Sequence, residues 1–251
     1  MHRIGFSTGA LAFGDFRRGL ELQRRDGVDA IELSALRESE LRPLVNALTT
    51  LNLDDFAFRS FHAPSSLEKM SPGEVAKILL GVAQLGFVII VHPDIIGNDL
   101  EPWRELGSNL FLENMDGRKS VCRTAQEMHL FFNELPEAKF CFDIGHARQV
   151  DPTMSGTVEF LLKFQNRLAE VHISEVNWQC KHRAISSTAA WAFRKMSALI
   201  PESVPVIIES VIAEDQIDHE LGVVRKCLDR KDLGTGMRNL RKSAAGCTGD
   251  F

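Results

Sequence analysis

Short apolar runs alternate with longer amphipathic stretches along most of the chain. Eight runs have the length and composition of β-strands, at residues 3–6, 28–33, 56–61, 87–91, 109–112, 139–142, 168–171 and 204–208. Eight further stretches show helical spacing or helix-boundary residues, at 15–25, 38–51, 73–85, 101–106, 124–133, 157–166, 187–200 and 214–228. A strand and a helix recur about every 30 residues, which is the size of a βα unit.

Several of these strands are apolar at every position, such as FVIIV at 87–91. Strands have this composition when helices cover both faces of a parallel sheet. The pattern therefore predicts an α/β fold, a single (β/α)8 TIM barrel formed by residues 1–230. A doubly wound open sheet is the alternative, which the lack of a glycine-rich phosphate loop after the first strand disfavours. Residues 231–251 are rich in Gly, Lys and Arg and are predicted to form a flexible C-terminal tail.

The bulk composition restricts the class of protein and its partners. Of the 251 residues, 44% are hydrophobic and 25% are charged, as in a globular domain with a sizeable core. The net charge of −5 disfavours a nucleic-acid partner, so we expect a small-molecule substrate, with a homo-oligomer left open. Five widely spaced cysteines without a CxxC motif favour free thiols in a reducing compartment. The sequence shows no signal-peptide pattern and no membrane-length apolar run, so we expect a cytoplasmic protein without membrane contact.

Residues that bind metals or transfer protons stand at the ends of the predicted strands. The set comprises Glu32, His62, His92, Glu113, Asp143 with His146, His172 and Glu209, and His182 follows in the next loop. In a parallel barrel the carboxyl ends of all strands meet at one face, where active sites lie. Taken singly, such a histidine is more often structural, and such a glutamate more often pairs with a cation or caps a helix. Convergence at one face makes a shared site the stronger interpretation.

Glu113, Asp143 and Glu209 would face one another and His172 at that end of the barrel. Three adjacent carboxylates without a cation would repel one another, and some would have to bind protons. A divalent metal ion removes this conflict. Carboxylate and imidazole ligands suit Zn, Mn, Fe or Co, whereas Mg is less compatible with so many imidazoles.

Four residues are candidates for binding the substrate. Lys181 and Arg183 flank His182 and are able to bind a phosphate or carboxylate, although solvated loop charges are an equal alternative. The position of Glu32 permits a substrate contact but does not require one. His146 either holds a second metal ion or contacts the substrate beside a single ion.

Six short segments resemble, in their order and approximate spacing, the xylose isomerase-like TIM-barrel superfamily. They are FHAP at 61–64, VHP at 91–93, LEN at 112–114, FDIGHARQVDP at 142–152, VHIS at 171–174 and IES at 208–210. This superfamily includes the sugar phosphate isomerase/epimerases and the endonuclease IV-like proteins of AP endonuclease family 2. The resemblance covers residues 4–212 and implies a barrel with a divalent-metal site.

Within the superfamily, the epimerases hold one metal ion with four strand-end residues. The resemblance places these ligands at Glu113, Asp143, His172 and Glu209. The two glutamates of those enzymes also move the proton, so the resemblance implies Glu113 and Glu209 as catalytic residues.

Endonuclease IV-like proteins hold three zinc ions with a wider set of ligands. In this chain the resemblance adds a possible second site from His62, His92, His146 and His182. Those proteins also have an aspartate where this chain has Cys180, which leaves a third ion and a cysteine ligand open. The implied cofactor is therefore about one to three divalent ions.

Two activities fit this resemblance, and a non-catalytic metal-binding barrel is a third alternative. The first is an isomerase or epimerase that acts on a small sugar or sugar phosphate through a metal-stabilised enediolate. The second is a multi-zinc phosphoesterase, which His62 and His92 favour because a one-metal isomerase does not need them. The acidic charge and the lack of long basic or aromatic insertions favour a small phosphodiester over duplex DNA.

Overall fold

The computed structural model describes residues 1–230, in which eight parallel strands close into a barrel. These strands are β1 (Ile4–Ser7), β2 (Ala30–Ser34), β3 (Phe58–His62), β4 (Val88–Val91), β5 (Leu110–Glu113), β6 (Lys139–Asp143), β7 (Leu168–Ile173) and β10 (Val206–Ile208). They follow one another around the ring in sequence order, and β10 closes it by pairing with β1. The predicted (β/α)8 fold is confirmed. The predicted tail at 231–251 lies outside the described residues.

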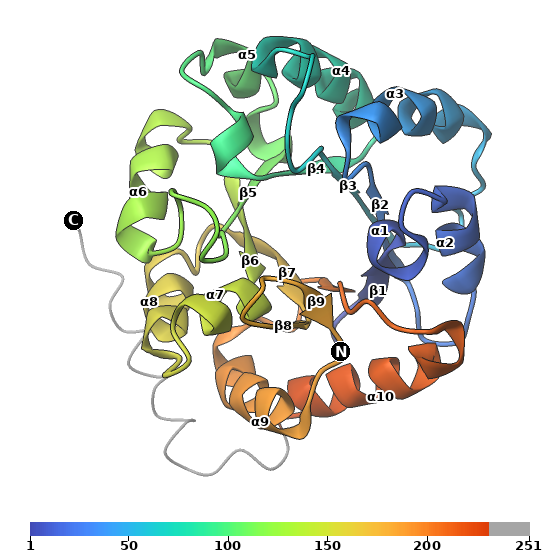
Figure 1. The fold of residues 1–251 in the computed structure, drawn as a ribbon, viewed down its shortest axis with the longest axis vertical. Helices are drawn as coiled ribbons and strands as arrows, with labels where there is room; N and C mark the ends of the chain where they lie inside the picture. The colour runs from blue at the N-terminus through green and yellow to red at the C-terminus, as the bar shows by residue number, and fades with distance from the viewer. Residues whose placement is uncertain (231–251) are drawn as a thin grey trace.

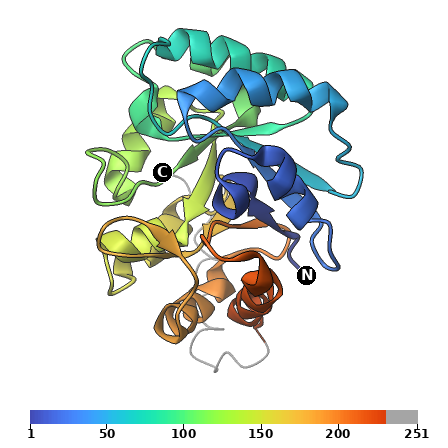
Figure 2. The same cartoon turned by 45° about the vertical axis from the view of Figure 1, so that its right-hand side comes forward.

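Helices surround the barrel on its outside, as Figure 1 and Figure 2 show from two directions. The predicted helices correspond to α2 (Phe16–Leu22), α3 (Glu38–Ala47), α4 (Pro72–Gln84), α5 (Glu101–Arg104), α6 (Ala125–Glu134), α8 (Ser155–Lys163), α9 (Ser187–Met196) and α10 (Ile217–Leu228). Short 3-10 helices occur at η1 (Leu48–Thr50), η2 (Pro93–Ile95), η3 (Gly107–Asn109), η4 (Ser197–Leu199) and η5 (Glu214–Gln216).

The local sequence explains where these helices begin and which face they bury. Before α4, the Ser71 hydroxyl accepts the N–H of Glu74, and the Glu74 carboxylate accepts the N–H of Ser71. Proline at the first position of the helix adds a fixed φ angle where no N–H is needed. The buried side of α4 carries Val75, Leu79 and Val82, spaced by three or four residues as an amphipathic helix requires.

Besides the 3-10 helices, four short elements were not predicted. Helix α1 (Thr8–Ala12) occupies the expected turn after β1, and α7 (Ile144–Val150) starts directly after β6. A two-stranded antiparallel hairpin, β8 (Glu175–Val176) and β9 (His182–Arg183), stands in the expected polar loop after β7. These elements are too short to produce a recognisable hydrophobic period. All four lie just after barrel strands, on the same face as the predicted site.

Apolar side chains fill the space between the strands and the surrounding helices. Phe132, Phe140, Phe160 and Phe164 pack together there, with ring centroids 4.9–6.4 Å apart. A core of this kind holds the strand ends in place and so fixes the residues that follow them. Within residues 1–230, no helix combines the length and the apolar character that a membrane span needs.

Candidate metal centre

The carboxyl ends of the barrel strands surround a cavity of about 590 Å³. Its lining includes six of the predicted site residues, namely His62, His92, Glu113, His146, His182 and Glu209. Asp143 and His172 are fully buried and contact this lining. The residues that the sequence places at one face of the barrel therefore do meet there.

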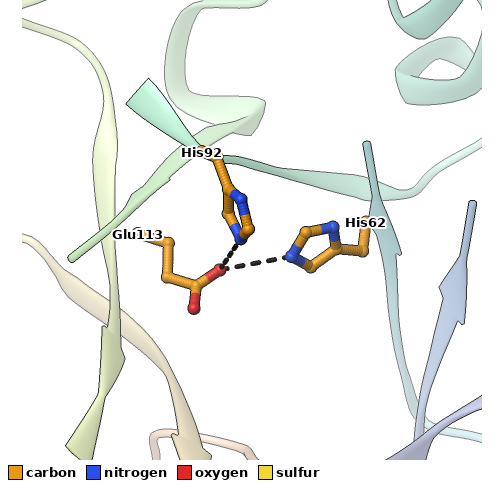
Figure 3. Close-up of side chains that lie close together, drawn as sticks. All are labelled: His62, His92 and Glu113. Carbon is orange, nitrogen blue, oxygen red and sulfur yellow. Dashed lines mark hydrogen bonds and ion pairs between the residues drawn. The ribbon is translucent and has the colours of Figure 1, made fainter. Parts of the chain in front are cut away.

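Glu113, the last residue of β5, lies at the centre of the cluster. Its Oε2 atom is 3.2 Å from Nε2 of His62 and 3.2 Å from Nε2 of His92. Figure 3 shows both imidazole rings pointing at this one oxygen. The opposite nitrogen of His62, Nδ1, lies 2.6 Å from the carbonyl oxygen of Ala63, which fixes the ring orientation. Three ligand-type atoms are thus within reach of a single cation.

The other oxygen of Glu113 faces a second group of ligand-type residues. Oε1 is 3.7 Å from Nδ1 of His172, and the same nitrogen is 3.5 Å from Oε1 of Glu209. Together with Asp143, these residues place four ligand-type atoms within 4.8 Å of one another. Glu113 belongs to both groups, so its carboxylate has the position of a bridge between two cations.

The backbone around α7 orients Asp143. Its Oδ1 atom accepts the N–H of His146 at 2.6 Å and thereby caps the helix. The side-chain amide of Asn114 bonds both the N–H and the carbonyl of Asp143, at 2.8 Å each. The remaining oxygen, Oδ2, is buried without a hydrogen-bond partner among the described residues. A buried carboxylate oxygen without a partner is compatible with a cation ligand.

His146 and His182 form a third group beside the first two. Their Nε2 atoms are 3.3 Å apart and face each other. Nδ1 of His146 lies 2.9 Å from the carbonyl of Asn114, and Nδ1 of His182 lies 2.8 Å from the Ser174 hydroxyl. Metal-binding histidines commonly show this pattern, with one nitrogen bonded to the protein and the other directed at the site. Burial lowers the pKa of His182 to about 4, so this ring is neutral at pH 7.

The cluster binds extra protons when no cation balances its charge. Burial raises the pKa of Asp143 to about 8, and nearby carboxylates act in the same direction. Burial opposes charge on His146, but Asp143 and Glu113 raise its pKa to about 10. Burial alone would raise the pKa of Glu113, yet His92 and His172 hold it well below its usual value. Protons on Asp143 and His146 thus supply positive charge that a divalent ion would supply instead, and the residues fit such an ion.

Two buried carboxylates stand behind His172. Its Nε2 atom is 3.1 Å from Oε2 of Glu32 and 3.4 Å from Oε1 of Glu170. Hydroxyl groups hold both carboxylates, since Ser34 donates to Glu32 and Ser60 donates to Glu170, each at 2.9 Å. Glu32 has no exposed surface and does not line the cavity. Its carboxylate contacts His172 and also lies within 4.8 Å of ligand-type atoms of His62 and Glu209, but its burial denies it the access that the expected substrate contact requires.

Lys181 and Arg183 do not line the cavity either. Both are exposed, and Arg183 bonds Oε1 of Glu175 across the hairpin at 2.8 Å. Successive residues of a strand point to opposite faces, so β9 turns Arg183 away from the side that His182 occupies. Cys180 does line the cavity, but its sulfur belongs to none of the ligand-type groups found among residues 1–230.

Two other cations line the cavity in the loop after β5 and were not predicted from the sequence. They are Arg118 and Lys119. Asp116 holds Arg118 in a two-pronged ion pair, and its Oδ2 is also 3.9 Å from Nε2 of His146. Lys119 donates to the carbonyl of Ser65 at 3.1 Å and forms an ion pair with Asp94. The sequence feature that could have indicated these residues is their position, because they follow the strand-end residue Glu113 within one short loop.

No protein-family model and no curated protein matches the sequence. Among solved structures, endonuclease IV from Thermus thermophilus is similar, with a TM-score of 0.58 and 20% identity over 90% of this chain and 98% of that chain. The IolI protein, solved with a bound zinc atom, has a TM-score of 0.61 and 13% identity over 92% and 100% of the two chains. A candidate sugar phosphate isomerase/epimerase from Anabaena variabilis has a TM-score of 0.55 and 15% identity over 99% and 100%.

At these identities the likeness shows a shared fold. Two of the three, the endonuclease IV and the sugar phosphate isomerase/epimerase, are of the kinds that the sequence motifs suggested, so the resemblance to xylose isomerase-like TIM barrels is confirmed for the architecture. The matches extend over nearly the whole length of each solved chain.

Proposed function

We propose that this chain is a metal-dependent phosphoesterase with a centre of two or more divalent ions. The observation that supports this most is the position of Glu113, whose two oxygens face separate groups of ligand-type residues. A one-metal isomerase would use the group of Glu113, Asp143, His172 and Glu209 and would leave His62 and His92 without a role. Because both rings point at Glu113, we place the phosphoesterase ahead of the isomerase, which the sequence favoured.

The residues fall into three sets of ligands in this proposal. His62, His92 and Glu113 form one set, and Glu113, Asp143, His172 and Glu209 form the second. His146, His182 and Asp143 form the third set. All four histidines of the predicted second site therefore belong to one of the ligand sets. Zinc suits these ligands best, although Mn, Fe and Co fit the same donors. When bound, such ions supply Lewis-acid stabilisation of phosphoryl oxygens and acidify an attacking water.

The protein's own residues orient the ester and handle the protons. Arg118 and Lys119 line the cavity as ion pairs with Asp116 and Asp94, and their N–H groups are the candidate donors to a phosphoryl oxygen near Glu113. The Glu209 carboxylate lines the cavity and lies within 3.5 Å of His172 and His182, where it is able to accept a proton from water. Glu113, Asp143 and His172 are buried, which strengthens the electrostatic interactions among them. The acidic chain fits a small ester better than duplex DNA.

Release of 4-nitrophenol from bis(4-nitrophenyl) phosphate tests this proposal. The protein is first stripped of metal and then reconstituted with zinc or manganese. We expect turnover that His92→Ala lowers by about 100-fold or more, as with loss of a group that acts electrostatically in the transition state. The control is His129→Ala, which changes an exposed histidine on α6 and should leave the rate unchanged. Absence of turnover with every metal that binds would refute the proposal.

Isomerisation of a small sugar phosphate is the second candidate. It rests on the complete group of Glu113, Asp143, His172 and Glu209, in which Glu113 and Glu209 would move the proton. Exchange of a substrate C–H with deuterated water would appear only for this activity. Such exchange on a ketose or aldose phosphate, with no ester hydrolysis, would establish the isomerase instead.

A further inference from the structure

One wall of the cavity is apolar and carries no predicted ligand. It is formed by Phe13, Leu36 and Val211, which follow the neighbouring strands β1, β2 and β10. The cations Arg118 and Lys119 follow β5, which lies four strands away from β1 on either path around the ring. The cavity therefore has an apolar side near β1, β2 and β10, and an opposite side near β5 that carries Glu113 and the ion-paired Arg118 and Lys119.

Phe13 occupies a backbone conformation that ordinarily belongs to glycine. The N–H of Asp15 bonds the carbonyl of Ala12 at 3.0 Å, which closes a four-residue turn. Phe13 is the first central residue of this turn, with φ of 52° and ψ of −119°. These angles match the first central position of a type II′ turn, where glycine is preferred because a side chain is strained there. Strained residues of this kind cluster at functional sites, so the Phe13 side chain is a candidate for a ligand contact.

The exposure of this wall is unusual for the protein. Phe13 exposes 59% of its surface, whereas every other phenylalanine within residues 1–230 is buried or half-buried. Val211 exposes 40%. Leu36 is held against α1, because a side-chain carbon added to Gly9 would lie only 2.7 Å from its Cδ1. Apolar side chains gathered in a concave polar site are typical of ligand contacts.

We propose that Phe13, Leu36 and Val211 form a subsite for a flat apolar ring of the substrate. The substrate would then be an ester that joins a phosphoryl group to a ring-bearing group such as an aryl alcohol or a nucleoside. Its ring lies on Phe13, and its phosphoryl group is directed toward Glu113 and the cations of the loop after β5. This inference extends the proposed phosphoesterase function. Only the phosphoryl group of the substrate rests on that function; the ring subsite does not.

Calorimetric binding of two compounds to the metal-reconstituted protein tests the subsite. Phenylphosphonate and methylphosphonate are not hydrolysed, and they differ only in the apolar group. We expect the phenyl compound to bind about tenfold more tightly, because burial of the ring on Phe13 adds apolar contact. Phe13→Gly should reduce this ratio to near unity and leave methylphosphonate affinity unchanged. The same variant should keep or raise the melting temperature, since glycine relieves the turn.

Leu130→Ala is the matched control, because Leu130 is also exposed, at 65%, but lies on α6 and does not line the cavity. It should leave the ratio of the two affinities unchanged. Equal binding of the two phosphonates to the wild type, binding of neither, or an unchanged ratio in Phe13→Gly would overturn the inference. If only the phosphoesterase proposal is wrong, the protein still binds phenylphosphonate but hydrolyses no ester.

Discussion

Each carboxylate oxygen of Glu113 is directed at a different set of imidazoles, and this single residue links the two best-formed ligand groups. His62 and His92 approach Oε2, while His172 lies on the side of Oε1. A carboxylate with ligands on both oxygens is well placed to bridge two cations and to keep them close enough to act on one phosphoryl group. This geometry is the reason for placing ester hydrolysis before isomerisation.

The carboxylate of Glu32 is expected to tune the metal through His172. Its Oε2 atom is 3.1 Å from Nε2 of His172, while Nδ1 of the same ring faces the cluster. Partners of this kind hold a ligand ring in place and raise its basicity. Glu32→Gln should therefore weaken metal affinity by about 10–100-fold. Competition with a chromophoric chelator measures this affinity.

Glu134→Gln is a suitable comparison for Glu32→Gln, because Glu134 is an exposed residue at the end of α6. It should bind metal as the wild type does. Wild-type affinity in Glu32→Gln, with normal folding by circular dichroism, would show that Glu32 does not support the centre.

The strand-end residues were predictable one by one, whereas the cations around them were not. Glu113 and Asp143 end apolar runs, and the barrel places such residues at one face. Arg118 and Lys119 lie in an irregular loop, where no period shows which side chain turns inward. The alternation of β9 explains the misplaced Arg183, since the inward position of His182 requires its neighbour to point outward.

At the scale of elements, the close packing of α7 against the hairpin brings His146 to His182. A side-chain carbon on Gly145 would lie 2.5 Å from the carbonyl oxygen of Ser174 and 2.9 Å from Val176. Gly145→Ala should therefore displace α7, lower the free energy of unfolding by about 1–3 kcal/mol and separate the two histidines. Denaturant unfolding and metal content measured on the same preparation check both effects.

Gly81→Ala provides the control for Gly145→Ala. It lies on α4, and nothing stands within 4 Å of the added carbon. Alanine in such a helix position should stabilise the protein by about 0.5–1 kcal/mol. Equal stability of the wild type and Gly145→Ala would mean that α7 is not closely packed at this point.

The loop after β3 is anchored to α3 by one carboxylate. Glu38 accepts the backbone N–H groups of Lys69, Met70 and Glu68, and these bonds lower its pKa. A group with a lowered folded pKa stabilises the protein above its unfolded pKa, and this contribution is lost as the pH falls through the folded value. Glu38→Gln should thus be less stable than the wild type at pH 7, and the difference should shrink in acid.

Thermal unfolding at pH 7 and at about pH 3.5 measures the effect of Glu38→Gln. Glu105→Gln, at another exposed glutamate, should differ little from the wild type at either pH. A difference for Glu38→Gln that is constant or larger in acid would contradict the proposed anchoring.

The long periodic elements were predictable and the short ones were not. Strands such as β4 and helices such as α4 combine an apolar pattern with clear boundary residues. The five-residue helix α1 and the hairpin of β8 and β9 depend on contacts with the completed barrel. No local sequence pattern therefore predicts them. The site depends on these short elements, because α7 and β9 carry His146 and His182.

At the scale of the whole molecule, the barrel brings together ligand-type residues that lie as far apart in the chain as His62 and Glu209. Folding therefore creates the proposed centre, and metal binding should stabilise the folded state. With free metal at about 100 times its dissociation constant, binding contributes about 2.7 kcal/mol. Removal of the metal by a chelator should then lower the melting temperature by about 5–10 °C. Saturation of the chelator with zinc beforehand serves as the control and should abolish the shift.

Elemental analysis of protein purified without chelator gives the metal content per chain and is the sharpest test of a centre with more than one ion. We expect roughly two or three divalent ions in the wild type, and about one fewer in His62→Ala, because Glu113 connects separate ligand groups. His129→Ala should retain the wild-type content. A wild type with no bound ion, or with a single ion that His62→Ala does not affect, would rule out the proposed centre of two or more ions.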